Sequence, residues 1–105
     1  MKTKRALVAL SALAQESRLA VFRLLVKHGP IGLTAGVMAE QLTMPSPTLS
    51  FHLKALAQSG LVVSKTEGRF VRYRADMAAF NALVEFLTED CCQGQPGVCS
   101  PENPK

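Results

Sequence analysis

The sequence predicts a mainly α-helical domain with one small β-hairpin. Apolar residues recur at helical spacing through much of residues 5–58 and again over residues 76–92, whereas residues 61–75 switch to a period of two. A length of 105 residues suits a single domain, and 48% hydrophobic residues can supply a core. We therefore expect one folded domain over residues 1–90 and a flexible tail over residues 91–105.

The N-terminal part predicts one or two helices that end at Gly29-Pro30. Residues 5–14, RALVALSALA, are apolar on several faces, so this segment needs more than one surface to pack against. A short helix then follows with Thr34 as its N-cap. Its expected inward-facing residues are Val37, Met38 and Leu42.

The most regular pattern lies in residues 44–60, MPSPTLSFHLKALAQSG. Pro45 ends the preceding helix, Ser46 is expected to cap the next one, and Pro47 suits its first position. Gly60 fits a left-handed residue after the last turn. Two short helices joined by a tight turn form a helix-turn-helix, and the second helix is expected to bury Leu49, Leu53 and Leu56.

A β-hairpin is expected directly after this unit. In LVVSKTEGRFVRYRA, Glu67-Gly68 is a turn signal, and residues 69–74 alternate between two faces and include three arginines. A hairpin beside a helix-turn-helix makes a winged helix-turn-helix.

The last expected helix covers residues 76–92, with Asp76 as its N-cap. Cys91 is expected to extend its apolar stripe, and acidic residues near its end oppose the helix dipole, so the last turn should fray. The stripe consists of Met77, Phe80, Leu83, Val84 and Leu87.

The charges are unevenly distributed along the chain. Residues 1–60 carry seven basic and two acidic side chains, residues 61–75 carry four and one, and residues 76–105 carry one and five. A basic body with an acidic end indicates a polyanionic partner for the body only, with an ordinary mixed surface as the alternative.

Candidate DNA contacts lie on the second helix of the helix-turn-helix and on the hairpin. Small polar and basic groups can reach base edges and phosphates while the opposite helix face packs. As alternatives, His52 can be a packed structural histidine, the arginines can form a solvated face, and Phe51 is expected in or near the core rather than on bases. The candidates are Ser46, Thr48, Ser50, His52, Lys54, Arg69, Arg72 and Arg74.

Three segments of the sequence together resemble the ArsR family, also called ArsR/SmtB. They are ALAQESRLAVFRLL, SPTLSFHLKALAQSGLV and GRFVRYRA, and the resemblance covers residues 5–90. Members are bacterial winged-helix repressors that release DNA when they bind metal. The resemblance implies a homodimer built from the first and last helices, with an inverted-repeat operator in double-stranded DNA as its partner.

The three cysteines, Cys91, Cys92 and Cys99, all lie near the C-terminus. Thiolates suit soft or thiophilic ions, and three sulfurs complete the shell of trivalent arsenic or antimony. From the residues alone, a zinc or cadmium site, a redox disulfide between Cys99 and either other cysteine, and incidental thiols stay open.

The family's other metal sites are missing from this sequence. Many arsenic-sensing members carry Cys-x-Cys at the start of the helix before the recognition helix, where this sequence has Thr34 and Gly36. Zinc-sensing members use aspartate and histidine pairs on the last helix, but here no histidine follows His52. The pattern resembles an arsenic-responsive branch with a vicinal pair and a third cysteine. That resemblance implies an arsenic-responsive repressor, with As(III) or Sb(III) bound by Cys91, Cys92 and Cys99. A redox-switched repressor that uses a C-terminal disulfide is the alternative.

Membrane and enzyme classes are not expected. No apolar run reaches 18 residues, and polar residues soon interrupt the apolar N-terminal stretch, so we expect a cytoplasmic protein with no membrane partner. The sequence has no Cys-x-x-Cys and no phosphate-binding glycine loop, so we expect no enzymatic activity and no catalytic cofactor.

Overall fold

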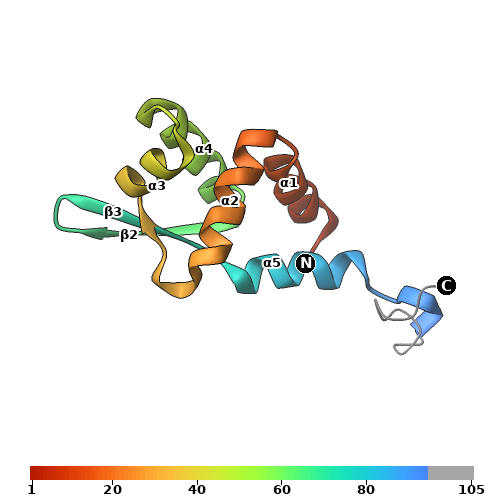
Figure 1. The fold of residues 1–105 in the computed structure, drawn as a ribbon. Coiled ribbons are helices and arrows are strands. Elements are labelled where there is room, and N and C mark those ends of the chain that lie inside the picture. The colour runs from red at the N-terminus through yellow and green to blue at the C-terminus, as the bar shows by residue number, and fades with distance from the viewer. Residues whose placement is uncertain (95–105) are drawn as a thin grey trace.

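The computed structural model describes residues 1–94, and within them the chain forms five α-helices and a three-stranded sheet (Figure 1). The expected fold class, mainly α with a small β-hairpin, is confirmed. In order, the elements are α1 (Thr3–Leu13), α2 (Glu16–His28), β1 (Leu33–Thr34), α3 (Ala35–Leu42), α4 (Ser46–Gln58), β2 (Val62–Glu67), β3 (Phe70–Ala75) and α5 (Met77–Leu87), with 3-10 turns at Gly29–Ile31 and Cys91–Gly94.

Local signals set several helix ends. The Gln15 side chain accepts a hydrogen bond from the Arg18 N–H at 2.7 Å to begin α2, and Asp76 accepts one from the Ala79 N–H at 3.1 Å to begin α5, as expected. Helix α2 ends at Gly29, with φ of +64°. The prediction for α4 was wrong by one residue: Pro45 occupies the N-cap position, and no side chain caps the helix.

The sheet has the strand order β1-β3-β2, with antiparallel pairs throughout. Glu67 pairs with Phe70, so the two residues between them, Gly68 and Arg69, form the turn. Gly68 has φ of +62°, which a glycine adopts without strain. Arg69 therefore lies at the hairpin tip rather than in a strand as expected. The hairpin projects from one end of the molecule, and α5 leads away at the other (Figure 1).

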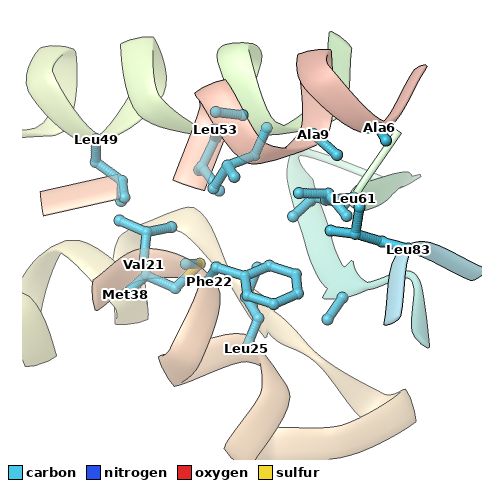
Figure 2. Close-up of a cluster of buried hydrophobic side chains, with 14 residues drawn as sticks. Ala6, Ala9, Val21, Phe22, Leu25, Met38, Leu49, Leu53, Leu61 and Leu83 are labelled. Atoms are coloured by element: carbon cyan, nitrogen blue, oxygen red, sulfur yellow. The ribbon is translucent and has the colours of Figure 1, made fainter. Parts of the chain in front are cut away.

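The core lies between α2, α4 and the start of the hairpin. Figure 2 shows Leu49 and Leu53 of α4 facing Val21 and Phe22 of α2. The predicted burial of Leu49, Leu53 and Leu56 is confirmed, as is that of Met38. The prediction was wrong for Val37, which is 40% exposed.

The two terminal helices keep large apolar side chains outside. Helix α1 buries only alanines in the core, and the buried residue of α5 is Leu83. The expected apolar stripe of α5 is therefore largely uncovered within the protomer. The exposed side chains are Leu7, Val8 and Leu10 on α1, and Met77, Val84 and Leu87 on α5. No helix among residues 1–94 is long and apolar enough to cross a membrane.

Candidate nucleic-acid interface and cysteine segment

Helix α4 offers a polar outer face at its N-terminal half. Helix α3 ends at Thr43, which has φ of +50°, and the chain turns directly into α4 at Ser46. Because no side chain caps α4 and Pro47 has no N–H, the first turn leaves the N–H groups of Ser46 and Thr48 for an external acceptor such as a phosphate oxygen. The exposed candidates on this helix are Ser46, Thr48, Ser50 and Lys54.

His52 does not lie with these residues. Its side chain is 6% exposed, and it packs on the core side of α4. Burial, with a smaller effect of the Arg18 charge, lowers the pKa of His52 below its usual value. The Nδ1 atom of His52 has no hydrogen-bond partner among the described residues. The structure thus has the packed histidine that the sequence left open, and a base contact would require His52 to leave the interior.

Phe51 is the residue on α4 that sequence reasoning misplaced. It was expected in or near the core, but its side chain is 66% exposed. Its ring meets the His52 ring edge-on at a centroid distance of 5.7 Å. Helical spacing from Leu49 and Leu53 to Phe51 could have indicated this, since residue 51 lies on the opposite side of the helix.

The hairpin arginines differ in their surroundings. Arg69 and Arg74 are exposed, whereas Arg72 is half-buried and its Nε donates to Oε1 of Glu67 at 3.0 Å. Lys65, which sequence reasoning missed, pairs in register with Arg72 and so shares its face of the sheet. The period-two alternation of β2 was the signal that could have found it.

The cysteine segment does not continue α5. The helix ends at Leu87, and the positive φ angles of Asp90 (59°) and Cys92 (52°) turn the chain away from a helical course. The expected extension of the α5 stripe to Cys91 was therefore wrong. Unfavourable acidic groups beyond the helix end are consistent with this early stop.

The two described cysteines are in different states. Cys91 has a free thiol and is half-buried, and Cys92 is disulfide-bonded. Residues 1–94 contain no group of three or more histidine, cysteine or acidic side chains that could hold a metal ion. Cys99 lies outside the described residues, so the three-thiolate site stays a prediction.

Comparison with known proteins identifies the helix-turn-helix unit. A family model described as a helix-turn-helix domain matches residues 13–65, about half of the chain. The HTH-type transcriptional regulator YceK of Bacillus subtilis (strain 168) is 36% identical over 67 residues, which are 62% of this chain and 66% of that protein. That match spans slightly less than two thirds of the relative.

Solved structures extend the likeness to the wing and the terminal helices. An ArsR-like transcriptional regulator from Rhodococcus sp. RHA1 has a TM-score of 0.75 at 27% identity, covering 90% of this chain and 87% of that one. HlyU from Vibrio cholerae N16961 has a TM-score of 0.68 at 30% identity, covering 89% and 100%, and was also solved in a form named as reduced.

A homodimeric winged helix-turn-helix DNA-binding domain from Mycobacterium bovis is similar as well. Its TM-score is 0.65 at 28% identity, and the match covers 88% of this chain and 85% of that one. The family model matches residues 13–65, and these structures match nearly the whole domain. The chain therefore belongs to the helix-turn-helix domain family, in the winged-helix form of ArsR- and HlyU-type transcriptional regulators.

Proposed function

We propose that this protein is an arsenic-responsive transcriptional repressor. Its homodimer binds operator DNA and releases it when As(III) or Sb(III) binds the thiolates of Cys91, Cys92 and Cys99. The observation that carries the DNA-binding part is the exposed polar and basic face of α4, beside a hairpin with exposed arginines. Small donors at an uncapped helix N-terminus suit phosphates and base edges, and the hairpin cations suit a neighbouring groove or backbone.

A homodimer accounts for the apolar surfaces of α1 and α5. Six large apolar side chains on these two helices are 38–60% exposed, and the helices contact each other. Covering such a patch with a second copy removes it from water. A two-fold axis there would present two α4 helices to successive major grooves, which predicts an inverted-repeat operator.

The inducer proposal rests on ligand chemistry and on position. Arsenite is thiophilic and takes three sulfur ligands, the number of cysteines that the chain carries. Cys91 and Cys92 follow α5, one of the two helices assigned to the dimer interface. Binding that reorders this segment would alter the interface and so the spacing of the two α4 helices. Coupling is reciprocal, so operator DNA must weaken arsenite binding by the same factor.

The test begins with DNA selected from a random duplex library by the reduced, arsenite-free protein. Fluorescence anisotropy then measures its affinity at several salt concentrations and during titration with sodium arsenite. We expect affinity that falls with salt, as it does when cations contact phosphates, and release as arsenite occupies the thiols. Unchanged affinity, after three free thiols have been counted with Ellman's reagent, would show that arsenite is not the inducer.

Redox switching is a second candidate, favoured by the disulfide of Cys92. In this alternative, oxidation of two thiols to a disulfide takes the place of arsenite as the releasing event. The structure provides a variant that separates the two. Cys91→Ser removes the free thiol but leaves the disulfide of Cys92 intact. A repressor of the arsenic type should lose high-affinity arsenite response in this variant, whereas a redox repressor should keep its full response to diamide.

A further inference from the structure

We infer that Phe51 reads a thymine methyl group in each operator half-site and so determines part of the DNA sequence preference. This inference rests on the proposed DNA-binding function and names a contact within it. A thymine methyl is the apolar group on the major-groove edge of a base pair, and aromatic side chains can contact it.

The position of Phe51 on α4 is the first support. Helical geometry places residues 47, 51, 54 and 58 on one side of α4, at about 100° per residue. All four are exposed, and the buried side of the helix carries Leu49, His52, Leu53 and Leu56. Phe51 therefore lies near the middle of the outer face rather than at its edge.

The chemical isolation of Phe51 is the second support. A phenyl ring neither donates nor accepts conventional hydrogen bonds, so it cannot distinguish bases by their polar edges. The ring is 66% exposed, and the one ring contact that it makes within the described residues is with His52. Such a side chain gains from burial against an apolar group of a partner.

The charge around Phe51 favours DNA over a protein or lipid partner. Lys54 lies three residues further on the same exposed side, and the preceding residue, Ser50, is also exposed. Residues 1–60 carry seven basic and two acidic side chains. The apolar surface assigned to the dimer lies on other elements, and α4 and α5 are on opposite sides of α2 in Figure 1. DNA offers a partner for both side chains, because its phosphates attract the Lys54 ammonium group and a thymine methyl in the major groove can contact the Phe51 ring.

The experiment uses the full-length reduced protein and duplexes selected from a random library. Each thymine of a selected duplex is replaced in turn by deoxyuridine, which removes only the methyl group, and anisotropy gives the affinity. For the wild type, we expect one thymine in each half-site where the replacement weakens binding about fourfold, the factor that corresponds to one buried methyl. Phe51→Ala should bind the two duplexes equally at that position.

Phe70→Ala is the matched control, because Phe70 is 63% exposed but lies at the start of β3. It should retain the fourfold preference. Full retention of the preference in Phe51→Ala, or no methyl-sensitive thymine for the wild type, would overturn this inference while leaving the proposed function standing. If the library yields no preferred sequence at all, the proposed function fails together with it. Both variants remove exposed side chains, so equal thermal midpoints should confirm that folding is intact.

Discussion

Replacing Leu7 by alanine should weaken the proposed homodimer and leave the fold of the protomer intact. Leu7 is 60% exposed on the outer side of α1, while the inner side of this helix packs through alanines. Alanine is also the strongest helix former, so α1 itself should not suffer. The effect therefore isolates the contribution of an apolar side chain to the interface between two copies.

The magnitude follows from the exposed fraction. Full burial of a leucine side chain contributes about 1.5–3 kcal/mol, so covering the 60% that is exposed contributes about 1–2 kcal/mol, most of which the substitution removes. In a two-fold interface each change counts twice, which gives about 2–3 kcal/mol, or a dimer Kd about 30- to 150-fold higher. Sedimentation equilibrium over a wide concentration range measures this constant directly.

Ile31→Ala provides the control for this experiment. Ile31 is 75% exposed and lies in the turn after α2, so it belongs to neither α1 nor α5. Its replacement should leave the dimer Kd within about twofold. Equal Kd values for wild type and Leu7→Ala, or equal weakening by both variants, would refute the assignment of α1 to the interface.

Three further predictions concern stability, measured as the free energy of unfolding in urea. Because the pKa of His52 is lowered in the folded state, the unfolded chain binds a proton at a higher pH than the folded protein does. The free energy of unfolding should therefore fall as the pH drops below 6.5, and the control variant His28→Gln should show the same decline. A free energy of unfolding that does not change with pH would contradict this prediction. Gly32→Ala should cost several kcal/mol more than Gly29→Ala. Both glycines have positive φ, but only at Gly32 would the new Cβ lie 2.1 Å from a carbonyl oxygen of β3. Equal losses for the two variants would refute this reasoning. Asp76→Ala should cost about 1 kcal/mol through loss of the α5 cap, and Asp76→Asn much less; similar costs would show that the cap is unimportant.

The buried face of a helix could be predicted from the sequence where the apolar residues fall on one side only. In α4, Leu49, Leu53 and Leu56 are spaced four and three residues apart and so share one helix face, which was expected to be buried and is. In α1 seven of the eight residues from Ala6 to Leu13 are apolar, so spacing alone could not tell which face packs against the rest of the protomer. The alanine face is the buried one because α1 packs closely on its neighbours. This depends on tertiary packing, which leaves no local signal in the sequence.

The candidate site was predictable to the extent that it depends on local chemistry. The exposed polar residues of α4 and the basic hairpin follow from composition and alternation. The exposure of Phe51 could also have been predicted, because residue 51 lies opposite Leu49 and Leu53 on the helix. The burial of His52 depends on how α4 rotates against α2, which a single segment does not specify. The end of α5 was anticipated as weak, but its position at Leu87 depends on backbone angles at residues 88–93.

The alanine-lined inner face of α1 reverses the usual rule of mutational tolerance. Substitutions that enlarge Ala6, Ala9 or Ala12, each at most 8% exposed, would push the helix away from the body and should act on folding. Substitutions of the larger Leu7, Val8 and Leu10 should instead change which assemblies form. For the homodimeric repressor proposed above, a selection for loss of repression should therefore recover two separable kinds of α1 mutant. Substitutions of the small residues should give unstable protein, and substitutions of the large ones should give abundant, folded protein that no longer forms dimers.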